Sequence, residues 1–213
     1  MEKKRFIFDL DGTILKTDYS YEKAYFRRVL GEEKAKVFIP RIFELLTLYE
    51  KTFPKYDIYN LSRFLTMKSG INITPEIIRG WNETFKETDS YLVEHVVDVL
   101  EYLKEKEKSI VVLTNWFLDV QKERLDKCLL SGYFEGIYGG ETYLKPFRES
   151  YYNACGNYSV GECVMIGDSL ENDVLGPMNY GLDAIYYDSN GKNNYDKKKV
   201  KAIRCMKEIK EMY

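Results

Sequence analysis

A chain of 213 residues has room for one large domain, or for a core of about 130 residues that carries a smaller insert. Hydrophobic residues make up 45% of it and charged residues 31%, a balance that supports a packed core and excludes general disorder. The net charge of −2 provides no basic surface field, so neither a nucleic-acid polymer nor a membrane is expected as a partner.

The N-terminus and the cysteines indicate the compartment. The apolar run before Asp9 is far too short for the core of a signal peptide, and no stretch approaches the roughly 20 apolar residues of a membrane span. Cys128, Cys155, Cys163 and Cys205 show no C-x-x-C spacing and are too few for a disulfide framework. With a single histidine in the chain, a Cys/His zinc site is disfavoured. We therefore expect a protein of the reducing cytoplasm.

Short apolar runs at four places predict buried strands. Residues 5–9 form the first run, which ends on an acid, and the others cover 109–113, 163–166 and 184–187. Each is rich in β-branched or aromatic residues and apolar at successive positions, as strands buried on both faces of a parallel sheet are. Residues 134–138 form a weaker fifth candidate.

Helical patterns lie between these runs. A stripe of apolar residues at i, i+3 and i+4 covers 93–103, before the strand at 109, and a second, imperfect stripe covers 118–130. Strands that alternate with helices indicate a doubly wound, mainly parallel, Rossmann-like α/β sheet.

Residues 17–89 break this alternation. They contain only helical periodicity, and Thr74-Pro75 supplies an N-cap and a proline at the first helical position of one helix. An insert directly after the first strand is the simplest account of this pattern. We therefore predict an α/β core over 1–16 and 90–213 and a smaller all-helical domain over 17–89.

Polar side chains follow four of the predicted strands, at their ends or in the loops after them. Because working groups of open parallel sheets gather at the carboxyl ends of the strands, these side chains are expected to meet at one edge. The segments that carry them are Asp9, Asp11, Gly12 and Thr13; Thr114 and Asn115; Lys145 and Pro146; and Asp168, Ser169 and Asp173.

The chemistry of this set favours a phosphate and a metal ion. Several carboxylates in one pocket cannot all stay ionised without a cation. Oxygen ligands favour a hard ion, and Mg²⁺ is the usual choice where a phosphate completes the octahedron. Lys145 would balance phosphate charge, and Gly12 lets the backbone approach a ligand closely. Any one of these residues alone is typical of a helix cap or a turn, but their order at four strand ends is not.

These motifs resemble those of the haloacid dehalogenase-like (HAD) hydrolase superfamily over nearly the whole core. Residues 8–13 (Phe-Asp-Leu-Asp-Gly-Thr) look like the family's first motif and 113–115 (Leu-Thr-Asn) like its second. Lys145-Pro146 is similar to the third motif, and 167–173 to the fourth. The third motif continues as Phe-Arg-Glu instead of the acid and proline often found in the family.

The resemblance implies a role for each acid of the first motif. Asp9 would be the nucleophile that takes the phosphoryl group, and also a metal ligand. Asp11 would give a proton to the leaving oxygen and then accept one from the attacking water, while its backbone carbonyl would touch the metal. Because the family's dehalogenating members lack an acid two residues after the nucleophile, Asp11 favours phosphoryl chemistry.

The other motifs would complete the site. Gly12, Thr114 and Asn115 would bind phosphoryl oxygens together with Lys145, which would also offset charge on the nucleophile. Asp168 would complete the metal site. Asp173 would act either as a ligand through water or as a partner of Lys145, which the sequence leaves open. The implied cofactor is Mg²⁺.

The insert matches the position of the family's helical cap, which closes over the site and selects the substrate. Tyr19, Tyr21, Tyr25 and Phe26 begin it and either line the substrate side or pack the insert's own core. Trp116, directly after the second motif, either forms a wall of the site or belongs to the core.

The implied function is hydrolysis of a small phosphorylated metabolite through an aspartyl-phosphate. A phosphomutase would use the same residues, and a non-catalytic relative would only bind the phosphorylated ligand. A response-regulator receiver domain also combines acids with a Lys-Pro, but it lacks the insert and a strand that ends in Asp-x-Asp-Gly-Thr. Sugar phosphates, phosphoglycolate and nucleoside monophosphates all stay open as substrates. Monomer and homodimer are both compatible with the sequence.

Overall fold

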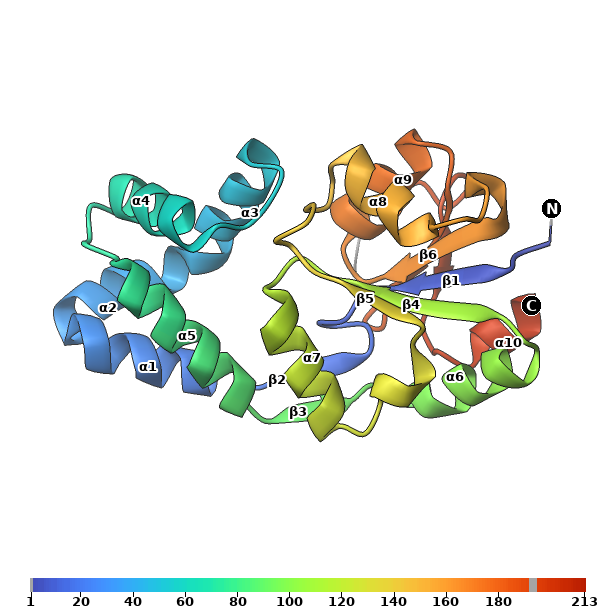
Figure 1. Cartoon of the computed structure of the whole chain (residues 1–213), viewed down its shortest axis with the longest axis horizontal. Coiled ribbons are helices and arrows are strands. Elements are labelled where there is room, and N and C mark those ends of the chain that lie inside the picture. The colour runs from blue at the N-terminus through green and yellow to red at the C-terminus, as the bar shows by residue number, and fades with distance from the viewer. Residues whose placement is uncertain (1, 192–194) are drawn as a thin grey trace.

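The main sheet of the computed structural model is parallel throughout (Figure 1). The structure describes residues 2–191 and 195–213, and within these ranges the sheet has six strands. The spatial order is β5 (Gly136–Tyr138), β4 (Ser109–Leu113), β1 (Arg5–Phe8), β6 (Cys163–Gly167), β7 (Asp183–Tyr187) and β8 (Lys201–Ile203). The five strands predicted from apolar runs are confirmed, including the weakest one at β5.

Alternate residues of each central strand face opposite hydrophobic clusters. In β1, Phe6 and Phe8 pack into one cluster and Ile7 into the other. The first cluster includes residues of α6 (Val96–Glu105), α7 (Leu118–Lys127) and α10 (Glu208–Met212), and the second includes residues of α8 (Arg148–Cys155) and the π-helical segment η4 (Leu170–Leu175). Because both faces are covered, nearly every position of these strands is apolar, and the predicted doubly wound α/β fold is confirmed.

Short helices connect the remaining strands of the core. They are η2 (Ser131–Tyr133), η3 (Val160–Glu162) and α9 (Gly176–Asn179). The order of the sheet reverses at β1, because β4 lies on one side of it and β6 on the other. The carboxyl end of β1 is therefore the switch point of the sheet, where ligands of open α/β folds bind.

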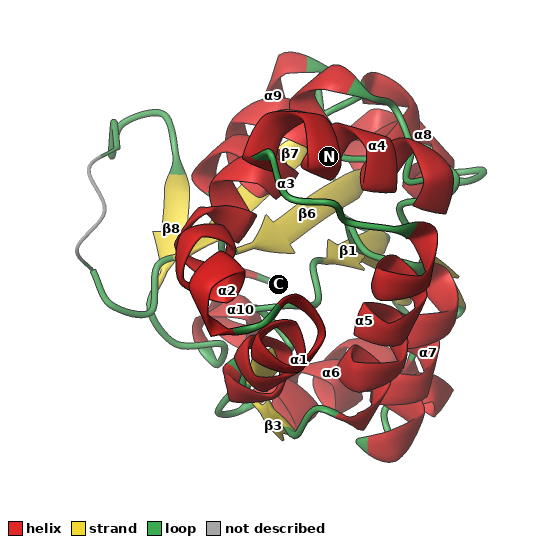
Figure 2. Cartoon of the chain, turned by 90° about the vertical axis from the view of Figure 1, so that its left-hand side faces the viewer, coloured by secondary structure: helices red, strands yellow, loops and turns green. Residues whose placement is uncertain are grey.

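Five α-helices form an insert beyond the carboxyl ends of the strands (Figures 1 and 2). They have a hydrophobic cluster of their own, with Phe26, Phe38, Tyr49 and Trp81 fully or almost fully buried. Thr74 caps the last helix as predicted, since its hydroxyl accepts from the Ile77 N–H. The helices are α1 (Ser20–Leu30), α2 (Glu32–Phe38), α3 (Ile42–Thr52), α4 (Ile58–Ser69) and α5 (Pro75–Glu87), with the short η1 (Ile39–Arg41) before α3.

A two-stranded antiparallel ribbon joins the insert to the core. It pairs β2 (Leu15–Thr17) with β3 (Ser90–Leu92), where the chain enters and leaves the insert. Core residues such as Trp116 and Leu144 belong to the same hydrophobic cluster as the insert helices, so the two parts share buried contacts. Among the residues that the structure describes, no helix has both the length and the apolar character needed to cross a membrane.

Candidate active site

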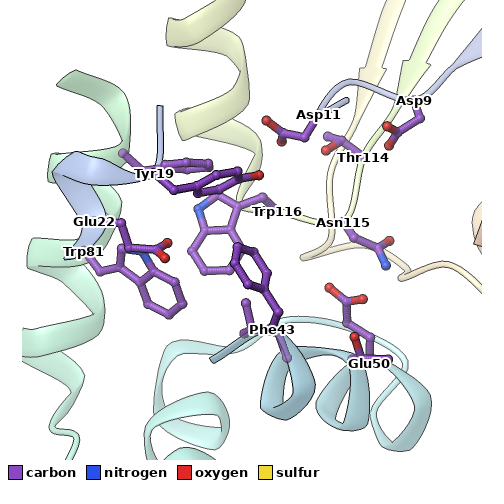
Figure 3. Close-up of a pocket in the computed structure, with 13 residues that line it drawn as sticks. Asp9, Asp11, Tyr19, Glu22, Phe43, Glu50, Trp81, Thr114, Asn115 and Trp116 are labelled. Atoms are coloured by element: carbon purple, nitrogen blue, oxygen red, sulfur yellow. The ribbon is translucent and has the colours of Figure 1, made fainter. Parts of the chain in front are cut away.

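A pocket of about 190 Å³ lies between the carboxyl edge of the sheet and the insert (Figure 3). The core contributes polar groups from the first and second motifs, and the insert contributes an aromatic wall with two acids. The lining residues are Asp9, Asp11, Thr114, Asn115 and Trp116 from the core, and Tyr19, Glu22, Phe43, Leu46, Thr47, Glu50, Trp81 and Phe85 from the insert and its ends.

Lys145 lies between two buried carboxylates beneath this pocket. Its Nζ is 2.6 Å from Asp9 Oδ1 and 2.7 Å from Asp173 Oδ1. Burial opposes the charge on the lysine, but the carboxylates of Asp173 and Asp9 outweigh it and raise the Lys145 pKa. The first, third and fourth motifs therefore meet in one ionic cluster. Asp173 also accepts from the Ser169 N–H, at 3.0 Å.

Asp9, Asp168 and Asp173 form a cluster of carboxylates whose oxygens lie within 4.8 Å of one another. Burial raises the pKa of Asp9, and the charges of Asp173 and Asp168 add to this effect, while Lys145 opposes it. Desolvation and the neighbouring Asp173 raise the pKa of Asp168 to about 6, although its side chain still reaches solvent. An all-oxygen set of anions that repel one another is a fitting environment for a hard divalent cation.

Asn115 is anchored to the third motif. Its Nδ2 donates to the Lys145 carbonyl at 2.8 Å, and its Oδ1 accepts from the Lys145 N–H at 2.7 Å. These two bonds hold the second and third motifs together, and the Asn115 side chain also hydrogen-bonds to the Glu50 carboxylate. The loop after Lys145, where the sequence departs from the family pattern, turns through a hydrogen bond from the Phe147 N–H to the Leu144 carbonyl and leads into α8.

The Asp11 carboxylate is held by three side chains that the sequence did not single out. Thr17 Oγ1 donates to its Oδ1 at 2.7 Å, and Arg124 Nη1 lies 2.8 Å from the same oxygen. Gln121 Nε2 donates to Asp11 Oδ2 and to Thr114 Oγ1, at 2.8 Å each. The first and second motifs are thus connected through α7.

A signal for these residues was present in the sequence. Gln121 and Arg124 are almost completely buried on α7, whose apolar stripe is imperfect because this polar pair occupies the inner face. Arg124 also donates to Ser90 Oγ and lies over the ring of Phe85, 4.4 Å from its centroid.

The insert brings two acids to the pocket. Trp81 Nε1 donates to Glu22 Oε2 at 2.8 Å, and the Tyr56 hydroxyl donates to Glu50 Oε1 at 2.7 Å. Burial raises the pKa of each glutamate to about 7. Neither acid was predicted, because each lies on a helix whose sequence pattern does not show which face meets the site.

The aromatic residues at the start of the insert divide between the site and the core. Tyr19 lines the pocket, where it packs edge to face with Phe43. Tyr25 and Phe26 are buried in the insert's own cluster, and Tyr21 is exposed, so the alternative of core packing holds for the first two. Trp116 is both a wall of the site and part of the core, because it lines the pocket while only 7% of its surface is exposed.

We expect Glu22→Gln to stabilise the folded protein more strongly as the pH rises. The folded pKa of about 7 lies above the ordinary value of 4.5, so the contribution of this group to stability is full below about pH 4.5 and is lost as the pH rises through 7. Glutamine keeps an oxygen for Trp81 and cannot ionise. Relative to wild type, its free energy of unfolding should increase by about 3 kcal/mol between about pH 4.5 and pH 8.

Urea unfolding across this pH range measures the difference. Glu44→Gln is the matched control, because Glu44 lies exposed on α3 and outside the pocket. If the difference in unfolding free energy between Glu22→Gln and wild type stays constant across this pH range, the burial of Glu22 is contradicted.

The fold and the site together define the class of the protein. The sequence model of the haloacid dehalogenase-like hydrolases matches residues 6–187, and the chain belongs to this family. Its fold matches that of the HAD-hydrolase YfnB from Bacillus subtilis, solved bound to magnesium, with a TM-score of 0.73 and 21% identity over 100% of this chain and 99% of that one. L-2-haloacid dehalogenase from Xanthobacter autotrophicus matches with a TM-score of 0.72, at 14% identity over 99% and 98% of the two chains.

Phosphatases are among the proteins of similar sequence. Human N-acylneuraminate-9-phosphatase is 37% identical over 105 residues, which cover 47% of this chain and 42% of that protein. Pyrimidine 5′-nucleotidase PynA of Streptococcus pneumoniae is 26% identical over 206 residues, 90% of this chain and 86% of the relative. The match to N-acylneuraminate-9-phosphatase thus spans less than half of that relative's length.

Proposed function

We propose that this protein is a Mg²⁺-dependent phosphatase that hydrolyses a small phosphorylated metabolite through an aspartyl-phosphate at Asp9. The observation that carries the proposal is the position of the Asp9 carboxylate, which lines the pocket while its Oδ1 contacts Lys145. The phosphatase relatives support the reaction class. Because their names denote different phosphate esters, they do not identify the substrate.

The reaction has two steps. Asp9 attacks the phosphorus, the bond from phosphorus to the leaving oxygen breaks, and Asp11 gives its proton to that oxygen. Water then attacks the phosphorus of the aspartyl-phosphate, Asp11 takes up a proton from the water, and inorganic phosphate leaves as the Asp9 carboxylate is restored. Positioning and charge neutralisation account for most of the catalysis in phosphoryl transfer.

The other polar groups position the phosphoryl group and balance its charge. Lys145 neutralises part of the charge that Asp9 and the phosphoryl group bring together. Thr114, held by Gln121, binds phosphoryl oxygens, as do the Asn115 amide and the backbone near Gly12. These groups sit on strand ends that both faces of the sheet hold rigid, so little reorganisation is needed during the reaction.

Mg²⁺ would be held by Asp9, Asp168 and the Asp11 backbone carbonyl, with Asp173 directly or through water. When bound, the ion supplies charge that neutralises the phosphoryl oxygens. We assign residues 1–16 and 90–213 to the catalytic core and 17–89 to a cap that excludes water and selects the substrate. The pocket supports this division, because the core contributes its catalytic polar groups and the insert contributes most of its aromatic side chains.

Release of p-nitrophenol from p-nitrophenyl phosphate tests the proposal. We expect turnover by the purified protein in Mg²⁺ and none in EDTA, with recovery when Mg²⁺ is restored. Turnover that persists in EDTA would contradict the metal dependence. Transfer of phosphate to an added sugar phosphate in place of water would identify a phosphomutase.

We expect Gly12→Ala to impair the site more than the fold. Gly12 has a φ of 86°, and a Cβ there would overlap the carboxylate of Asp168. Because the substitution displaces a proposed metal ligand, kcat should fall by about 100-fold and half-saturation should need more Mg²⁺. A magnesium titration of the p-nitrophenyl phosphate assay measures both.

Gly70→Ala is the matched control. Gly70 has a similar φ of 72°, but its Cβ would meet nothing within 4 Å. Both variants should lose about 1 kcal/mol of stability from the left-handed backbone, and only Gly12→Ala should lose activity. Equal activity of the two variants would show that Asp168 does not need its present position.

A further inference from the structure

The insert side of the pocket carries two acids. Glu22 on α1 and Glu50 on α3 lie on either side of Phe43 and Trp116 (Figure 3). In the described part of the chain, the lining of this pocket includes no Lys, Arg or His. Of the nearby cations, Lys145 is engaged by two carboxylates and Arg124 by Asp11. A leaving group that enters this space meets acceptors and no cation.

A carboxylate on the leaving group would be strongly disfavoured here. It would be removed from water without a counter-charge, and the two glutamates would face it as like charges. Burial raises the pKa of both glutamates to about 7, so above this pH both are ionised and already carry an electrostatic cost. A third anion in the same space would add to this cost, whereas an uncharged or cationic group would not.

The carboxylate oxygens of Glu22 and Glu50 have free lone pairs that can accept hydrogen bonds from a ligand. Glu22 accepts a hydrogen bond from the Trp81 side chain, and Glu50 accepts from the side chains of Tyr56 and Asn115. An ionised carboxylate has about four acceptor positions, so each retains capacity for an O–H or N–H group of a ligand. Buried acceptors of this kind discriminate strongly, because a ligand without donors leaves them unpaired.

The walls between the glutamates are flat and aromatic. The aromatic lining consists of Tyr19, Phe43, Phe85 and Trp116. The pocket volume of about 190 Å³ is only slightly larger than the roughly 150 Å³ of an apolar cavity that holds benzene. Throughout residues 2–191 and 195–213, no acceptor pairs with the buried indole N–H of Trp116. The flat walls and this volume suit a single ring.

We propose that the substrate is a phosphate monoester whose leaving group is a single-ring alcohol, uncharged or cationic, with O–H or N–H donors for Glu22 and Glu50. The inference rests on the proposed phosphatase function and deepens it. It makes the two glutamates specificity-determining residues, which exclude esters whose leaving group carries a carboxylate.

Three benzyl phosphates that differ only at the para position test this substrate class. They carry a hydroxymethyl, an aminomethyl or a carboxylate group, so size and ring are nearly constant while the charge changes. In Mg²⁺ at about pH 8, where both glutamates are ionised, kcat/KM for the carboxylate ester should be lower by about 100-fold than for the other two. In Glu22→Gln with Glu50→Gln this ratio should shrink by about tenfold or more, because the like charges are removed.

Glu44→Gln is the matched control from the exposed side of α3, and its ratio should equal that of wild type. Efficient hydrolysis of all three esters by wild type, or a ratio unchanged in the double variant, would overturn the substrate class and leave the phosphatase function standing. Failure to hydrolyse any of them, p-nitrophenyl phosphate included, would overturn the phosphatase function and the substrate class with it.

Discussion

Asp9→Asn is expected to lower kcat for p-nitrophenyl phosphate by about 10⁴-fold or more, because the amide cannot form the aspartyl-phosphate. The fold should survive the change. Burial and the neighbouring acids oppose the charge on Asp9, so removing that charge relieves the cluster, although Lys145 loses one of its two partners. We expect a free energy of unfolding within about 1 kcal/mol of wild type.

The covalent intermediate offers a second readout of the same change. Wild type quenched during turnover and treated with hydroxylamine should carry a hydroxamate on the peptide that contains Asp9, and Asp9→Asn should carry none. Asp126→Asn is the matched control, since Asp126 is an exposed aspartate of α7. A hydroxamate at another acid, or full activity of Asp9→Asn, would exclude Asp9 as the nucleophile.

Lys145→Met is expected to damage both stability and activity. The variant leaves the buried carboxylates of Asp9 and Asp173 without their shared cation. Removing one partner of a buried ionic cluster typically costs about 3–5 kcal/mol. We expect a loss of this size in urea unfolding near neutral pH in EDTA, together with loss of phosphatase activity.

Two further variants separate lost charge from lost packing. Adding Asp173→Asn to Lys145→Met removes one unpaired carboxylate and should restore part of the stability. Lys36→Met should change stability by less than about 0.5 kcal/mol, because Lys36 and its partner Glu33 are both exposed. A Lys145→Met variant as stable as Lys36→Met would show that the ionic cluster contributes nothing to the fold.

The central strands of the core could be predicted because burial on both faces makes nearly every position apolar. The ribbon of β2 and β3 and the edge strand β8 could not, because each has only three residues, polar ones among them, and so shows neither an apolar run nor a period. The role of α7 could not be predicted either, because the polar residues Gln121 and Arg124 only interrupt its apolar stripe in the sequence. These side chains are buried because they face Asp11, which lies more than 100 positions earlier in the chain.

The candidate site also has a part that could be predicted from the sequence and a part that could not. Asp9, Asp168 and Lys145 could be placed because parallel strands bring their carboxyl ends to one edge. That Asn115 binds the backbone of Lys145 could not be foreseen, because an amide is equally suited to a phosphate oxygen. Glu22 and Glu50 come from helices whose orientation over the sheet depends on packing between the two parts of the molecule.

The anchoring of Asp11 limits how this protein can be re-engineered by exchange of its insert. Arg124 donates to Thr17 of β2 and to Ser90 of β3, so one guanidinium ties both ends of the insert to the acid. A chimaera joined inside residues 18–89 would keep these bonds and could accept foreign helices. A chimaera joined closer to the sheet would lose the hydroxyls of Thr17 and Ser90. Arg124 would then lose two hydrogen-bond partners and Asp11 one, however well the new helices folded.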